Sequence, residues 1–239
     1  MAKRGQKKHF KRITTPLSIG IGDKKKNEWI TKAECGPHNI KNAIPLAVLL
    51  RDILKICQTN KEVKKVLSEK MVNINGKIRT NEKFPVGLMD IISIEKSGKN
   101  YLMIVKKHSR LVPFEISAEK TNERMGKVIK KYTCKKGQIM IGIHDGTLIR
   151  GDNNIKTGDT IVLSTKENKI NKILKLQKGA VCLIKGGKHA GTVATIEEIV
   201  ETEAGRQNEA RMKNKNEEFI TVLKHICVID DNTAGAYNE

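Results

Sequence analysis

Aromatic residues are scarce in this chain: Phe, Tyr and Trp make up 3% of its 239 residues. RNA-binding surfaces that stack bases on exposed rings need such residues, so the composition argues against that mode of binding. The hydrophobic fraction, 38%, is also a little below that of a typical globular domain. Together these shortages predict several small Ile/Val/Leu cores rather than one large core.

Paired cysteines are missing as well. The five cysteines are odd in number and far apart, with no CxxC pair: Cys35, Cys57, Cys134, Cys182 and Cys227. This spacing supports neither a disulfide framework nor a tetrahedral zinc site. The stretch Cys35-Gly36-Pro37-His38 would be half of a metal site without a second half, so we interpret it as a turn. We expect reduced thiols, no metal and no cofactor.

Membrane signals are also lacking. The N-terminus is basic but has no apolar segment of the kind found in signal peptides, and no apolar run is long enough to span a bilayer. We therefore expect a cytoplasmic protein that does not contact a membrane.

Acidic residues are outnumbered by basic ones. The 46 Lys and Arg residues against 26 Asp and Glu leave a formal net charge of +20, and the isoelectric point is near 9.8. Such an excess indicates a polyanionic partner. An acidic membrane surface is the second candidate, but the basic stretches carry no apolar anchor. We therefore expect nucleic acid, bound mostly through its phosphates.

Residues 1–42 are predicted to be a basic N-terminal extension. Its lysines and arginines surround few apolar residues, and such a density of like charge leaves little to bury. We expect an arm that becomes ordered on RNA. Its candidate RNA-binding residues are Lys3, Arg4, Lys7, Lys8, His9, Lys11 and Arg12.

Two helices and a hairpin are predicted within residues 43–105. Apolar residues at helical spacing from Ile44 to Cys57 predict a first helix, and Thr59-x-x-Glu62 is a capping-box pattern that starts a second. Asn75-Gly76, between two apolar runs, predicts a tight hairpin before a strand at 88–94. The candidate RNA-binding residues of this region are Arg51, Lys55, Lys61, Lys64, Lys65, Asn75, Lys77, Arg79 and Lys83.

Short strands are predicted in the rest of the chain. Strands at 101–105, 127–132, 139–143 and 160–163, with glycines between them, give a small β domain at 106–173. Within 174–229, a glycine-rich loop at 186–191 joins two strands, and 219–229 is predicted to be a closing strand. Residues 230–239 are predicted to be a C-terminal tail.

The loop at 186–191 has the sequence Gly-Gly-Lys-His-Ala-Gly. It is not a P-loop, because no Ser or Thr follows its lysine to bind magnesium. Glycines let a loop backbone approach RNA closely. Lys185, Lys188 and His189 are the expected donors to RNA.

The order of these segments resembles one family. Two short helices followed by a basic hairpin resemble the S-four-like RNA-binding module, and the strand–loop–strand at 180–196 resembles the KOW motif. Together they resemble the archaeal and eukaryotic ribosomal protein family S-four-e over nearly the whole chain, in its archaeal form. Further matching stretches lie at 8–12, 36–38, 84–94 and 144–146, whereas Thr14, Thr15 and Cys35 depart from the family's pattern.

The resemblance implies an α+β, multi-domain fold. Its parts would be a small α/β S-four-like RNA-binding module at 43–105, the small β domain and an SH3-like β-barrel KOW domain. It also implies a structural constituent of the small ribosomal subunit that supports translation. Such a protein would bind small-subunit ribosomal RNA and neighbouring small-subunit proteins in the cytoplasm, with no small-molecule substrate.

Two alternatives stay open. The first is an RNA-modifying enzyme tethered by an S-four-like domain, for which His144-Asp145-Gly146 is the one suggestive cluster. A His-Asp pair without a nucleophile or metal partner is more typical of a turn, so we expect no enzyme. The second is a KOW-type transcription or translation factor, which would not explain residues 44–105.

Overall fold

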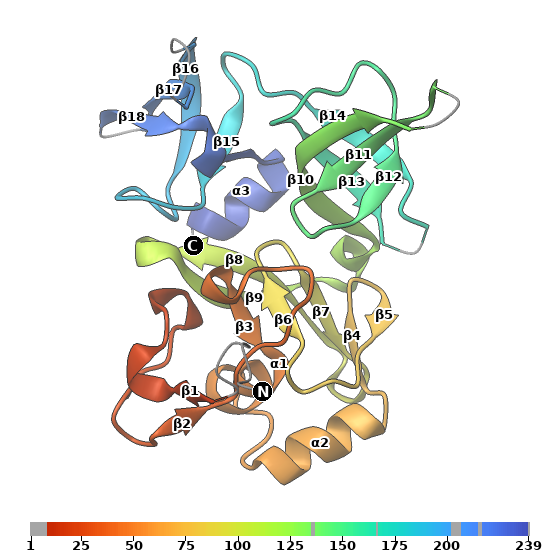
Figure 1. Ribbon diagram of the computed structural model, residues 1–239, viewed down its shortest axis with the longest axis vertical. Coiled ribbons are helices and arrows are strands. Elements are labelled where there is room, and N and C mark those ends of the chain that lie inside the picture. Colours follow the sequence, from red (N-terminus) through yellow and green to blue (C-terminus); the bar gives the residue numbers. More distant parts are fainter. Residues whose placement is uncertain (1–8, 135–136, 166, 202–206, 215–216, 239) are drawn as a thin grey trace, which may run out of the picture.

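The computed structural model describes residues 9–134, 137–165, 167–201, 207–214 and 217–238. Its described part is mostly β, with several antiparallel sheets and few helices (Figure 1). Three of the sheets have five strands each, and each of these has an apolar cluster of its own. The multi-domain organisation is therefore as predicted, whereas the α+β prediction assigned too much helix.

The N-terminal unit is built around the sheet β5–β4–β7–β8–β9. These strands are Lys77–Ile78, Val72–Ile74, Ile91–Ile94, Lys99–Lys106 and Arg110–Ile116. Two short pairs accompany the sheet: β1 (Phe10–Lys11) with β2 (Trp29–Ile30), and β3 (Ala43–Pro45) with β6 (Pro85–Gly87). The sheet continues to Ile116, past the boundary expected at 105.

The first predicted helix is shorter than its apolar spacing suggested. Ile44 pairs with Val86 in β3–β6, and α1 (Leu46–Val48) begins after Pro45 and continues into a π-helical segment, Leu49–Ile53. Residues 46–50 are all buried, so this segment is apolar on every side rather than along one stripe. Lys55, with a φ of 54°, lies in the left-handed region beyond its end. The apolar periodicity therefore overestimated the length of the first helix.

The second helix and the hairpin form as predicted. In α2 (Asn60–Ser68), the Thr59 hydroxyl accepts from Glu62 N at 3.3 Å, and the Glu62 carboxylate accepts from Gln58 N at 2.8 Å. Both backbone donors at the helix start are thereby satisfied. At the β4–β5 turn Asn75 and Gly76 have φ values of 50° and 72°, the left-handed conformation that a type I′ turn needs.

Residues 9–42 are packed against the N-terminal unit, where the sequence predicted an arm that RNA orders. Ile19 and Ile30 are buried in its apolar cluster, and Phe10 and Ile21 pack on the edge of that cluster. Burying such a side chain contributes roughly 1.5–3 kcal/mol, which favours order in this basic segment. The prediction of an arm rested on the density of charge and neglected these scattered apolar residues.

The central unit has the sheet order β12–β11–β10–β13–β14. Its strands are Leu148–Arg150, Ile139–Ile143, Glu123–Thr133, Thr160–Ser164 and Ile170–Leu174. The C-terminal unit has the order β18–β17–β16–β15–β19, with strands Glu218–Val222, Glu209–Lys213, Val193–Val200, Val181–Ile184 and Ile226–Val228. Figure 1 shows these two sheets side by side above the N-terminal unit.

Short 3-10 turns connect many of these elements. They are Arg12–Thr14, Leu17–Ile19, Ile40–Asn42, Glu95–Ser97, Lys107–Ser109, Ala118–Asn122 and Leu223–His225. The last of them divides the closing strand that was predicted at 219–229. β18 pairs with β17 before the turn, and β19 pairs with β15 after it.

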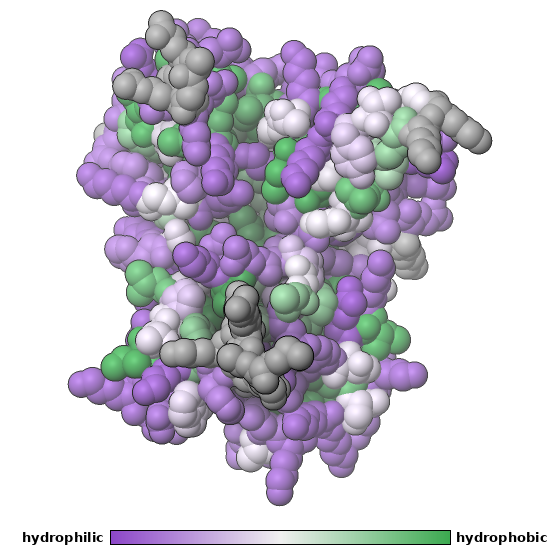
Figure 2. Space-filling view, in the orientation of Figure 1, coloured by the Kyte–Doolittle hydropathy of each residue, from purple (hydrophilic) through white to green (hydrophobic). Residues whose placement is uncertain are grey.

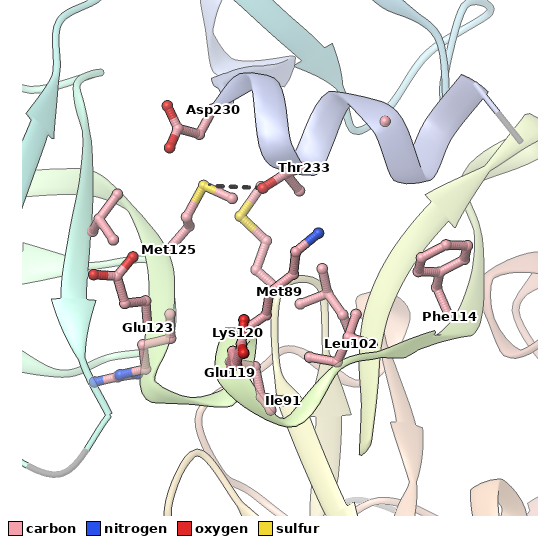
Figure 3. A pocket seen from close by; sticks show the side chains of 14 residues that line it. Met89, Ile91, Leu102, Phe114, Glu119, Lys120, Glu123, Met125, Asp230 and Thr233 are labelled. Atoms are coloured by element: carbon pink, nitrogen blue, oxygen red, sulfur yellow. Dashed lines mark hydrogen bonds between the residues drawn. The ribbon is translucent and has the colours of Figure 1, made fainter. Parts of the chain in front are cut away.

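A C-terminal helix, α3 (Asp231–Asn238), occupies the segment that was predicted to be a tail. Its Ala234 and Tyr237 pack against a buried cluster that joins Met89 of the N-terminal unit to Leu183 of the C-terminal unit. Met125 of the central unit also contacts this cluster, with its Sδ 3.9 Å from the Thr233 hydroxyl (Figure 3). The helix therefore covers the place where the three units meet.

A buried lysine forms a second contact between units, here between the central and C-terminal units. Lys127, on β10, is 7% exposed, and its ammonium donates to the carbonyl oxygens of Leu223, at 2.8 Å, and Ile226. Burial lowers the pKa of Lys127 to about 8. The ammonium ties the central sheet to the strand β19 and to the turn before it, which fixes the relative position of the two upper units.

Candidate nucleic-acid interface

The lysines of α2 form an exposed basic surface among the predicted RNA-binding residues. Val63 and Leu67 are buried against the core, which leaves Lys61, Lys64 and Lys65 exposed on the other side of the helix. We call these three lysines the α2 face. Lys64 lies 3.6 Å from the Glu82 carboxylate, whereas Lys61 and Lys65 have no ion pair within the described residues. Figure 2 shows this lower end of the molecule as strongly hydrophilic.

Of the residues in the β4–β5 hairpin that were predicted to bind RNA, one makes structural hydrogen bonds and another is exposed. The Asn75 side chain donates to Asp90 at 2.7 Å and accepts from Ile91 N at 2.9 Å, so it holds the turn against β7. A Cβ on Gly76 would lie 2.9 Å from the Thr165 side chain, which shows that the turn touches the central unit. Lys77 is exposed.

Two further cations near this hairpin contact protein groups. The Arg79 guanidinium lies over the Phe84 ring, 4.4 Å from its centroid, and Lys83 pairs with the Glu34 carboxylate at 3.4 Å. Both side chains reach the surface. Weak surface pairs such as Lys83–Glu34 leave the lysine available to a phosphate at little cost.

Arg12 and Arg51 are arranged around one carboxylate. Arg12 is 6% exposed, donates from Nε to Asp23 O at 2.8 Å and lies 3.9 Å from Asp52. Arg51 donates from Nε and Nη2 to the two oxygens of Asp52, each at 2.9 Å. These hydrogen bonds and the charge of Asp52 raise the pKa of Arg51, although burial opposes them. Arg12 and Arg51 thus serve the fold, whereas Lys55 is exposed beside them.

The N-terminal candidates lie beside an aromatic ring that the sequence analysis did not single out. Trp29, the only tryptophan in the chain, is 50% exposed. The His9 ring is 5.4 Å from it, and the Lys11 ammonium is 5.9 Å from its centroid. The exposed ring and the Lys11 ammonium together suit an RNA base and its phosphate. Lys3, Arg4, Lys7 and Lys8 lie outside the described residues.

The loop at 186–191 contacts protein through its outer glycines and is open at its centre. A Cβ on Gly191 would lie 2.5 Å from the Lys106 backbone, and one on Gly186 would lie 2.8 Å from the His225 ring. Gly187, with a φ of 91°, has open space around it. Close packing of the loop against the rest of the protein therefore accounts for Gly186 and Gly191, whereas Gly187 is favoured by its positive φ.

Of the loop's three predicted donors, Lys188 is the most open. It is exposed, whereas the His189 ring stacks on Phe219 with centroids 4.1 Å apart. Lys185 is half-buried, and burial together with the charge of Lys224 lowers its pKa.

A basic turn that the sequence analysis passed over lies next to this loop. The β8–β9 turn carries the exposed side chains of Lys106, Lys107, His108 and Arg110. Its backbone touches Gly191, so its charges add to those of the loop. The local sequence signal, four basic residues within five positions, was present. What the sequence could not show was that the two segments meet.

The suggestive His144-Asp145-Gly146 stretch forms a structural turn. Asp145 accepts from Thr147 N at 2.8 Å and pairs with the Arg124 guanidinium, which also donates to Asn168 at 2.9 Å. Burial opposes the charge of Asp145, but the Thr147 amide and Arg124 outweigh it and lower its pKa. His144 lies between Lys127 N and Leu88 O. Neither side chain has a role left for proton transfer.

The described residues give no metal site. They contain no group of three or more His, Cys, Asp or Glu side chains that could hold a metal ion. All five cysteines are described and unpaired, with Cys57, Cys182 and Cys227 buried. No helix within this described part is long and apolar enough to cross a membrane.

Comparison with known proteins reveals relatives along nearly the whole chain. Residues 97–170 match the sequence profile of Ribosomal family S4e. The small ribosomal subunit protein eS4 of Methanosphaera stadtmanae is 36% identical over 229 residues, covering 96% of this chain and 95% of that protein. The protein eS4A of Schizosaccharomyces pombe is 34% identical, covering 95% of this chain and 87% of that protein.

A solved structure has the same fold. The crystal structure of the 30S ribosomal protein S4e from Thermoplasma acidophilum superimposes with a TM-score of 0.69 at 28% identity. The similarity covers 80% of this chain and 97% of that one.

Proposed function

Since this chain belongs to the ribosomal protein family S4e and is a structural, non-enzymatic protein of the small ribosomal subunit, we propose that it works by holding ribosomal RNA on two basic surfaces. One is the α2 face, and the other is the loop at 186–191 with the adjoining β8–β9 turn. The protein's place is the cytoplasmic ribosome, and its relatives are archaeal and eukaryotic small-subunit proteins.

The proposal assigns the three units to modules. The N-terminal unit, with two short helices and the Asn75-Gly76 hairpin, is proposed to be an S-four-like RNA-binding module. The C-terminal unit is proposed to be an SH3-like KOW barrel, which its five-stranded antiparallel sheet around the loop at 186–191 supports. The central unit lies beside the C-terminal unit, and both contact the N-terminal unit. Ribosomal RNA and neighbouring small-subunit proteins are the proposed partners.

The observation that carries the proposal is the unbalanced charge of the α2 face. Only one of its three exposed lysines, Lys64, forms an ion pair within the described residues, in a chain of net charge +20. Like charges three and four residues apart on a helix repel each other in the free protein. Phosphates relieve that repulsion and release counterions, so the α2 face gains most by binding a nucleic-acid backbone.

Replacing Lys61, Lys64 and Lys65 together with glutamine is expected to weaken binding to small-subunit ribosomal RNA. Each lysine that contacts a phosphate contributes about one unit to the slope of log affinity against log salt, so the slope should fall by about two to three. Filter binding over a range of salt concentrations measures both quantities.

The matched control replaces Lys156, Lys169 and Lys175, three exposed lysines in or just after the central unit. It removes the same charge and should leave affinity and slope close to those of the unaltered protein. Equal losses in the two triple variants would contradict a specific role for the α2 face.

A further inference from the structure

A pocket of about 440 Å³ lies where the three units come together, on the side of the loop at 186–191. We call it the junction pocket. Its walls come from all three units and include His38, Leu88, Ile129, His144, Lys185 and His225. Its size is within the range of roughly 300–1,000 Å³ that is usual for small-molecule sites.

The charge of the junction pocket suits an anion. Lys185 and Lys224 line it with three of the chain's six histidines, and none of the described residues that line it is acidic. The pocket beneath α3 (Figure 3), in contrast, is lined by three acidic side chains, Glu119, Glu123 and Asp230, as well as by Lys120 and Arg124. Neither Lys185 nor Lys224 has an ion pair among the described residues. Burial and, to a smaller extent, the charge of Lys224 lower the pKa of Lys185, and a bound anion would offset the repulsion between the two lysines.

Free backbone donors lie at the same wall. The N–H groups of Gly186 and Gly187 have no hydrogen-bond partner within the described part of the chain, whereas Lys185 N donates to His225 O at 2.8 Å. Neighbouring free amides in a glycine-rich turn are a recurrent way to bind phosphate oxygens. Two lysines and two free amides therefore line the same pocket.

The rest of the pocket is too apolar for a phosphate alone. Leu88, Val105, Leu111 and Ile129 line it, and Ile129 is 49% exposed although it is a large aliphatic residue. The His225 ring lies beside them, and burial and the nearby lysines lower its pKa, which favours its neutral form. Apolar walls beside a neutral imidazole suit a nucleobase, which needs apolar contact with its faces and a few hydrogen bonds.

We propose that the junction pocket binds one unpaired nucleotide of the RNA, with its phosphate at Lys185, Lys224 and the amides of Gly186 and Gly187. Its base lies against Ile129 and the neighbouring aliphatic side chains. The proposal rests on the proposed function, because it takes RNA as the source of the nucleotide. The two basic surfaces of the proposed function bind only phosphates. The junction pocket would in addition recognise an extruded base.

The test uses the full chain and the ring signals of its histidines. Adenosine, guanosine, cytidine and uridine 5′-monophosphates are titrated singly, with inorganic phosphate and the free nucleosides as separate arms. At least one nucleotide is expected to shift His144 and His225 along a saturating curve, with His9 unmoved. Replacing Lys185 and Lys224 with glutamine should weaken this binding by about tenfold or more, the loss of one to two charge-assisted hydrogen bonds, whereas Lys156→Gln should not.

Unmoved histidine signals with every nucleotide, or equal shifts with inorganic phosphate alone, would overturn the nucleotide pocket. Ribosomal RNA binding measured on the same protein separates the two levels of the argument. If RNA still binds tightly while no nucleotide enters the pocket, this inference is wrong and the proposed function stands. If neither binds, both are wrong.

Discussion

Replacement of Asp90 by alanine is expected to lower the free energy of unfolding by roughly 3–5 kcal/mol, as for other broken buried ion pairs. Asp90 is 2% exposed, and its carboxylate lies 2.9 Å from His38 Nε2. It also accepts from Asn75 Nδ2 at 2.7 Å and from Gly87 N at 2.8 Å. Alanine leaves a histidine, an amide and a backbone N–H buried without their acceptor.

Urea denaturation at a pH near 6 measures this loss. The matched control is Glu115→Ala, which removes an exposed carboxylate 3.7 Å from Lys99 and should change stability by less than about 1 kcal/mol. Similar small losses in the two variants would show that Asp90 does not hold the N-terminal unit together.

The same ion pair gives a pH dependence with a definite sign. Burial opposes the charge of His38, but the Asp90 carboxylate outweighs it and raises the pKa of His38 above its ordinary value of 6.5. A histidine that binds its proton more tightly when folded contributes stability below about pH 6.5 and loses it as the pH rises through the raised pKa. Asp90 sets the acid limit of this stability. Its pKa is lowered, so its contribution to stability is lost only as the pH falls through that lowered pKa.

His38→Gln isolates this contribution, because His144, Asp145 and the other titrating groups near it are shared by the two proteins. The stability difference between the unaltered protein and His38→Gln should be largest near pH 6 and shrink toward pH 8.5. A difference that grows with pH would mean that His38 is neutral beside Asp90.

The affinity for small-subunit ribosomal RNA is expected to fall by about 10³-fold or more between roughly 50 and 200 mM salt. This follows if about six phosphates or more are bound by the exposed lysines of the α2 face, the loop at 186–191 and the β8–β9 turn. Each phosphate contact releases condensed counterions, and the entropy of that release decreases as salt rises.

The salt experiment has a built-in comparison. Titration with a chloride salt at constant pH gives the slope for the unaltered protein, and the α2-face variant should be flatter. An affinity that hardly changes with salt would show that the net charge of +20 does not drive RNA binding.

Some local elements were predictable because their cause is local. The Thr59–Glu62 capping box and the Asn75-Gly76 turn depend on residues within a few positions of each other, and both form as predicted. The strand predicted at 139–143 is β11, with the same bounds. In such segments the local conformation agrees with the packing of the whole chain.

Other features could not be predicted because distant residues decide them. Arg12 is predicted to bind RNA from its charge alone, and the sequence did not show that its guanidinium donates to the Asp23 carbonyl and lies 3.9 Å from Asp52. The C-terminal helix α3 has little apolar surface of its own and forms over a cluster that three units supply. The β8–β9 turn has the right charges, but only tertiary contact with Gly191 brings them beside the loop at 186–191.

Sucrose-gradient sedimentation of ribosomal subunits at physiological salt tests the central claim most directly. The account predicts that this protein sediments with the small subunit at close to one copy per particle and stays there through repeated gradients. Its recovery only in the slowly sedimenting fraction, with small subunits that lack it, would contradict a structural role in the ribosome.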